Sequence, residues 1–125
     1  MTKAEIEIIK SVEKDIRELF SGEFSGHDLL HTLRVVKNAR MLNEDGTGND
    51  FIITLSALLH DADDRKLFPE SAENNGNARK ILGKYSVSGE ITDRIIDIIN
   101  STYYTKFEID LDKLINVCPL GKITN

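Results

Sequence analysis

The chain has 125 residues, of which 40% are hydrophobic and 30% are charged, and its net charge is −5. This predicts one soluble globular domain over residues 1–125, and the acidic balance argues against duplex nucleic acid as a partner. The single cysteine, Cys118, excludes an internal disulfide. Neither a signal segment nor an apolar run of the roughly 20 residues needed for a membrane span is present, so we expect a cytoplasmic protein with no membrane partner.

Two amphipathic helices are predicted first, because apolar residues recur there at spacings of three and four. The earlier one covers residues 4–20 and starts with a capping box of Thr2 and Glu5. Its expected inward residues are Ile9, Val12, Ile16 and Leu19. The later one starts near Ser25 or Gly26 and runs to Leu42. Its expected inward stripe is Leu29, Leu33, Val36 and Arg40, flanked by Leu30 and Ala39.

A third helix is predicted over residues 50–63, after the polar loop 43–50. The run from Phe51 to Leu59 is almost wholly apolar, which favours a central helix that is buried on all sides. The β-branched start of this run also fits a strand, but no good second strand exists to pair with it. An acidic cluster of Asp61, Asp63 and Asp64 follows, and residues 70–77 are a polar loop.

The remaining elements are also predicted to be helical. A fourth helix covers residues 77–85, with Ala78, Ile81 and Leu82 inward. A fifth covers residues 88–102, capped by Ser88, with Ile91, Ile95, Ile98 and Ile99 inward. A short sixth helix begins near Asp110. Because no alternating strand pattern is present, the predicted fold class is all-α, a compact bundle of about five to six short helices.

The three histidines of the chain fall in two short motifs, Gly26-His27-Asp28-Leu29-Leu30-His31 and Leu58-Leu59-His60-Asp61. His27 and His31 are four residues apart and therefore share one helix face. Imidazole and carboxylate groups together suit Mn²⁺, Fe²⁺, Zn²⁺ or Co²⁺. Asp64 would share a face with Asp61 if the third helix continued, which suits a general acid or base. Each motif alone also fits ordinary structural or surface polar residues.

The ordered pattern of His31, then His60-Asp61, then a later Asp resembles the HD superfamily of metal-dependent phosphohydrolases. Two longer stretches resemble one bacterial branch that is similar to nucleotide pyrophosphohydrolases. Residues 26–35 match its opening, HD-x-x-H-x-x-R-V, and residues 57–66 match its second motif, A-L-L-H-D-x-x-D-x-K. The resemblance covers residues 20–102 and implies an all-helical fold.

The resemblance also implies roles for individual residues. The metal ligands would be His31, His60, Asp61 and Asp112, with Asp110 as the alternative to Asp112 and His27 as a supporting residue. The metal would be Mn²⁺ by preference, with Fe²⁺, Co²⁺, Zn²⁺ or Mg²⁺ as alternatives. Asp64 would act on the attacking water or the leaving group. Two cations, Arg34 and Lys66, would contact the substrate phosphate.

The activity implied by the resemblance is hydrolysis of a phosphoester or phosphoanhydride bond in a nucleotide or another small phosphorylated metabolite, and a homo-oligomer is compatible with it. The branch's motif around the fourth ligand is only half present, because Ile115-Asn116-Val117 stands where its second half would be. We therefore expect a C-terminally shortened domain. The alternative function is an inactive HD domain that serves as a metal-binding, nucleotide-binding or interaction module.

Overall fold

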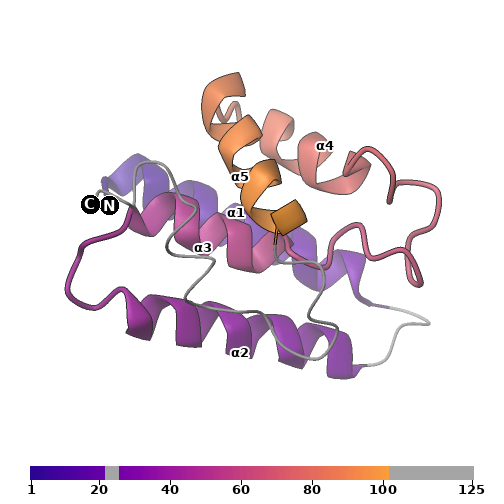
Figure 1. Cartoon of the computed structure of the whole chain (residues 1–125), viewed down its shortest axis with the longest axis horizontal. Helices are drawn as coiled ribbons and strands as arrows, with labels where there is room; N and C mark the ends of the chain where they lie inside the picture. Colours follow the sequence, from indigo (N-terminus) through magenta and orange to yellow (C-terminus); the bar gives the residue numbers. More distant parts are fainter. Residues whose placement is uncertain (22–25, 102–125) are drawn as a thin grey trace.

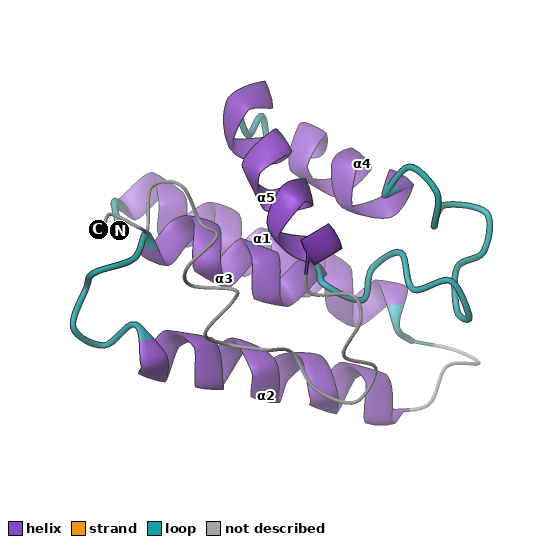
Figure 2. Cartoon of the chain, viewed as in Figure 1, coloured by secondary structure: helices purple, strands orange, loops and turns teal. Residues whose placement is uncertain are grey.

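The computed structural model describes residues 1–21 and 26–101, with side chains from residue 29 onward in the second range. Within these ranges it contains five α-helices and no strand (Figures 1 and 2). They are α1 (Lys3–Leu19), α2 (Gly26–Leu42), α3 (Asp50–Leu59), α4 (Gly76–Lys84) and α5 (Gly89–Ser101). The predicted all-α bundle is confirmed, and the predicted sixth helix lies outside the described residues. None of the helices described here is long and apolar enough to cross a membrane.

α3 is the centre of the bundle. Every residue from Phe51 to Leu59 is buried, as predicted, because α1, α2 and α5 all pack against this helix. α4 completes the bundle by packing against α1 and α5. Figure 1 shows α2 on one side of α3, with α4 and α5 on the other side. α2 is therefore an edge element, and its outer face points away from the rest of the described helices.

The helix starts that depend on local hydrogen bonds are confirmed. The backbone amide of Thr2 donates to Glu5 Oε1 at 3.0 Å, and the amide of Glu5 donates to Thr2 Oγ1 at 3.1 Å, which completes the predicted capping box. Ser88 Oγ accepts a hydrogen bond from the amide of Ile91 at 3.2 Å. The bounds of α1, α4 and α5 each lie within one residue of the predicted bounds.

The predicted inward stripe of α2 is wrong. The fully buried residues of this helix are Thr32, Val35 and Ala39, whereas Arg40 is exposed and Leu30 is 55% exposed. The side chains that face α3 are therefore small, and small side chains at a helix contact allow the two helix axes to approach closely. The larger Leu29, Leu33 and Val36 are only half-buried at the margin of this contact.

α3 is shorter than predicted, because it ends at Leu59 and not at Asp63. Residues 60–63 form turns, in which the amide of Ala62 donates to Leu59 O and the amide of Asp64 donates to Asp61 O. Three carboxylates near the negative end of the helix dipole would destabilise a continued helix. The turn also frees the Asp63 carboxylate to bind elsewhere, as described below.

Candidate functional site

The loop between α2 and α3 determines which residues of these two helices meet. The buried Asn43 side chain donates to Gly48 O at 3.1 Å and accepts from the Gly48 amide at 2.6 Å, which fixes the loop. A Cβ at Gly48 would lie 2.6 Å from Ile53 Cδ1 and 2.7 Å from Asn43 Oδ1, so a larger residue there would have to displace these side chains. The two helices consequently form an antiparallel hairpin, and the N-terminal half of α2 lies beside the C-terminal end of α3 (Figure 1).

This hairpin brings His31 of α2 next to His60 and Asp61. One ligand atom from each of these three residues lies within 4.8 Å of the other two. The imidazole rings of His31 and His60 meet edge to face, with centroids 5.3 Å apart and an interplanar angle of 68°. Two nitrogen or oxygen ligands of one transition-metal ion are at most about 4.4 Å apart. Three ligands of one ion are at most about 3.8 Å from one another, so the three residues need adjustments of up to about 1 Å to share one ion.

The protonation of the His60 ring follows from its backbone contact. His60 Nδ1 lies 2.7 Å from the carbonyl oxygen of Ala57. Because a carbonyl oxygen can only accept, Nδ1 carries the proton and donates this hydrogen bond. In the neutral ring, Nε2 then presents a lone pair towards Asp61. A histidine held by a backbone carbonyl through one nitrogen and facing a metal with the other is a common arrangement in metalloproteins.

The second nitrogen of His60 has an unusual environment. Nε2 lies 3.1 Å from Asp61 Oδ2, which is ion-pair distance, but it is buried and has no hydrogen-bond partner of acceptable geometry. The His60 side chain is only 7% exposed, whereas that of Asp61 is 33% exposed. A buried Nε2 beside a carboxylate oxygen is stable when a proton on Nε2 or a cation lies between the two atoms. The donor set therefore fits a cation that enters from the partly exposed side of Asp61.

Asp61 is held in the state that binds metal. Burial tends to raise the pKa of this carboxyl group, but the adjacent His60 and the more distant His31 lower it by a larger amount. The net result is a pKa below the ordinary value of aspartate, so Asp61 is ionised at neutral pH. Ligation by a carboxylate requires this ionised form.

The other predicted site residues do not belong to the cluster of His31, His60 and Asp61. Asp64 is half-buried and follows the ligand turn, but because α3 ends early it does not lie on a helical face shared with Asp61. Arg34 is exposed and follows His31 by three residues. Lys66 is also exposed and follows Asp61 by five residues. Asp110 and Asp112 lie outside the described residues, and so does the side chain of His27.

Asp63 has a supporting role that sequence reasoning did not identify. Its Oδ1 accepts a hydrogen bond from the amide of Asn77 at 2.7 Å, and its Oδ2 accepts one from the amide of Ala78 at 3.0 Å. The Asn77 side chain in turn donates to the carbonyl oxygen of Ala62 at 2.9 Å. These bonds cap α4 from a distance and fix the turn that carries His60 and Asp61. No local signal predicts them, because the partners are 14 and 15 residues apart.

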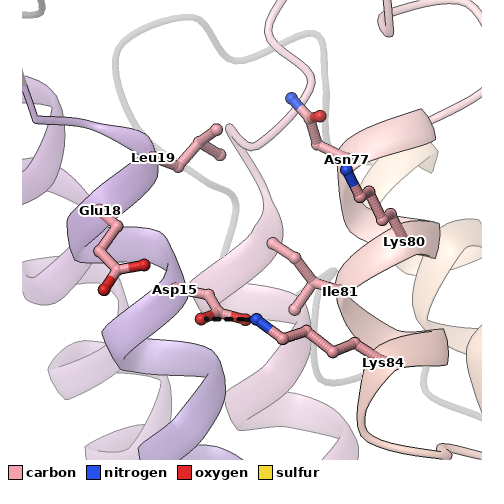
Figure 3. A pocket seen from close by; sticks show the side chains of 7 residues that line it. All are labelled: Asp15, Glu18, Leu19, Asn77, Lys80, Ile81 and Lys84. Carbon is pink, nitrogen blue, oxygen red and sulfur yellow. Dashed lines mark hydrogen bonds and ion pairs between the residues drawn. The ribbon is translucent and has the colours of Figure 1, made fainter.

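A surface groove of about 310 Å³ lies between α1 and α4 (Figure 3). Figure 3 shows Lys84 of α4 reaching across it to Asp15 of α1, at 3.2 Å. Its lining residues are Asp15, Glu18, Leu19, Asn77, Lys80, Ile81 and Lys84. None of the three clustered ligand residues contributes to this groove, so the groove is separate from the candidate metal site and meets its supporting network only at Asn77.

The comparisons with known proteins give one informative similarity. The chain is 30% identical over 95 residues to YpgQ of Bacillus subtilis (strain 168), which is itself described as uncharacterized. The match covers 76% of this chain and 46% of YpgQ, so the chain spans about half the length of the curated relative. No family model and no solved structure matches the chain. None of these comparisons names an activity, so we infer the function of the chain from the geometry of the site.

Proposed function

We propose that this protein is a metal-dependent phosphohydrolase of the HD type, acting on a nucleotide or another small phosphorylated metabolite. The observation that carries the proposal is the convergence of His31, His60 and Asp61, in which His60 Nε2 lies 3.1 Å from Asp61 Oδ2. Two imidazoles and one carboxylate bind Mn²⁺, Fe²⁺, Co²⁺ or Zn²⁺ better than Mg²⁺, and among them we propose Mn²⁺.

Each residue of the cluster has a defined task in this proposal. His31 and His60 supply nitrogen ligands, and the Ala57 carbonyl keeps the His60 ring in the tautomer that ligation needs. Asp61 supplies a carboxylate whose pKa is already lowered by the two histidines. A bound divalent ion would supply an activated water and would polarise a phosphoryl oxygen. Asp112, with Asp110 as the alternative, is proposed to complete the ligand set.

The residues around the cluster are proposed to position the substrate. Asp64 is tied to the ligand turn through its amide, which donates to Asp61 O at 3.2 Å. From there its carboxylate orients the attacking water or gives a proton to the leaving oxygen. The exposed side chains of Arg34 and Lys66 neutralise the phosphate of the substrate. A cytoplasmic location belongs to the same proposal, since a single cysteine, Cys118, suits a reducing compartment.

The proposal is tested by measuring metal content and turnover together. The purified chain is analysed for bound Mn, Fe, Co and Zn and then assayed with added Mn²⁺ for release of phosphate or pyrophosphate from a panel of nucleoside triphosphates and sugar phosphates. We expect about one bound ion per chain and release that a chelator abolishes. Bound metal without release from any substrate would favour the alternative, an HD domain that serves as a binding module. Failure to bind any of these metals would overturn the phosphohydrolase and leave only the nucleotide-binding or interaction form of the alternative.

A further inference from the structure

A row of cations runs along α2 from the candidate metal site. Arg34, Lys37 and Arg40 follow His31 at successive intervals of three residues, and all three are exposed. Residues three apart on a helix are surface neighbours, with Cβ atoms about 5–6 Å apart. The row is therefore continuous, and it rises roughly 13 Å along the helix axis from His31 to Arg40. Each step also turns the row by about 60° around the axis, so Arg40 lies about half a turn from His31. Residues 29–42 contain no acidic residue, although the whole chain has a net charge of −5.

The arginines of this row form no ion pair with a described carboxylate, unlike three arginines on the other helices. Arg17, Arg79 and Arg94, on α1, α4 and α5, each form an ion pair with a carboxylate. Arg34 and Arg40 form no ion pair with another described residue, and neither does Lys37. Arg65, which closely follows the ligand turn, is the third described arginine without such a pair. The guanidinium groups that are left for an external anion thus lie on α2 and beside His60-Asp61.

We infer that Lys37 and Arg40 form an outer anion subsite that continues from Arg34 and binds a linear chain of inorganic phosphate groups. Three cations along about 9 Å of helix exceed what one phosphate group at the metal site requires, and they suit a ligand that repeats its negative charge along its length. α2 contains no Phe, Tyr or Trp on which bases could stack, so inorganic polyphosphate is favoured over a single-stranded nucleic acid. Any role of this subsite in catalysis rests on the proposed function, whereas the binding of polyphosphate to the subsite does not.

The experiment measures binding to the full chain in the presence of a chelator, so that hydrolysis and metal play no part. The ligands are short-chain inorganic polyphosphate, pyrophosphate and an oligothymidylate. We expect polyphosphate to bind at least about tenfold more tightly than pyrophosphate. Lys37→Glu/Arg40→Glu should bring the ratio of these two affinities close to one. The milder Lys37→Ala/Arg40→Ala pair should lower polyphosphate affinity in the same direction and guards against a folding defect in the charge-reversed protein.

The matched control is Lys10→Glu/Lys14→Glu, which makes the same change in net charge at two exposed lysines of α1. This control should retain most of the preference for polyphosphate. The slope of log affinity against log salt concentration should fall by roughly 1.4–1.8 in the α2 alanine pair, since each lost phosphate contact contributes about 0.7–0.9.

Three results would overturn the inference. Polyphosphate could bind no more tightly than pyrophosphate, the α1 control could lose as much affinity as the α2 variant, or oligothymidylate could bind as tightly as polyphosphate. A failed hydrolysis assay is a separate result, because it contradicts the proposed function and leaves the metal-free binding measurement unchanged.

Discussion

His60 Nε2 lies 3.1 Å from Asp61 Oδ2 without a hydrogen bond between them, although the two residues are adjacent in the chain. The Ala57 carbonyl oxygen accepts a hydrogen bond from Nδ1. In the neutral ring Nε2 therefore presents a lone pair to Asp61, whereas in the protonated ring it forms an ion pair with this carboxylate. Together with His31 this pair forms the cluster that we propose as the metal site. The predictions about metal binding start from it.

Replacement of either member of the pair should remove the metal. His60→Ala and Asp61→Ala should each weaken affinity by at least about a hundredfold, which is above the usual loss for residues that only support a ligand. Metal analysis after dialysis measures this, and far-ultraviolet circular dichroism checks that helical content persists. Asp97→Ala is the control, since it removes an exposed carboxylate of α5 and should keep the metal. Full occupancy in both site variants would show that the ligands were misassigned.

Asp64→Asn should separate binding from chemistry. The amide keeps the size of the side chain but cannot accept or give up a proton, so we expect normal metal content and turnover lower by about 10²–10⁴-fold. Steady-state kinetics on the best substrate measures the effect as a fall in kcat. Asp97→Asn, on the exposed face of α5, should leave kcat unchanged. Wild-type turnover in Asp64→Asn would remove this residue from the mechanism.

Asp63→Ala should destabilise the fold without touching a ligand. The substitution removes two hydrogen bonds to the amides of Asn77 and Ala78 and leaves the start of α4 uncapped. Loss of such a cap lowers the free energy of unfolding by about 1–2 kcal/mol. Urea titration gives the value, and Asp97→Ala should stay within about 0.5 kcal/mol of wild type. Equal stability of the two variants would contradict the assigned role of Asp63.

A cluster between α1 and α4 should make stability fall at alkaline pH. Tyr85 donates to Asp15 Oδ2 at 2.8 Å and Lys84 lies 3.2 Å from the same oxygen, and these bonds to Asp15 raise the pKa of both Tyr85 and Lys84. A group whose pKa is raised in the folded state adds to the free energy of unfolding. This added stability is complete below the pKa of the unfolded state and is lost as the pH rises through the pKa of the folded state. The cluster should therefore contribute fully at neutral pH and progressively less above about pH 10.

The comparison that measures this is wild type against Asp15→Asn, by urea titration from about pH 8 to pH 11. The difference in unfolding free energy should be constant at the lower end and shrink at the upper end. Asp93→Asn is the control, because its partner Arg79 stays charged throughout this range and the corresponding difference should not change. A constant difference for Asp15→Asn would contradict the prediction.

The features that the sequence predicted well are those decided by neighbouring residues. The capping box of Thr2 and Glu5, the Ser88 cap and the all-round burial of the run from Phe51 to Leu59 need no knowledge of distant contacts. The same holds for the bundle class, since no described segment shows an alternating strand pattern. The two histidine motifs also led to His31, His60 and Asp61, which the hairpin of α2 and α3 brings together.

The features that it missed depend on partners far along the chain. The inward face of α2 is Thr32, Val35 and Ala39 because the close contact with α3 requires small side chains, and hydrophobicity alone favoured the leucines. α3 ends at Leu59, and the turn that follows lets the Asp63 carboxylate accept hydrogen bonds from the amides of Asn77 and Ala78 in α4. Asp64 was placed on the face of Asp61 only through that extra helical turn, so the error in its position follows from the error in the helix.

The bonds between Asp63 and the start of α4 also have a consequence for hydrogen exchange. The amide protons of Asn77 and Ala78 are protected only while the turn after His60-Asp61 keeps its shape. These protons exchange when the turn opens locally. Any ion that binds only the closed turn raises the free energy of this opening and so slows exchange. Their exchange rates therefore report occupancy of the site from a different helix, without any substrate and without any knowledge of the reaction.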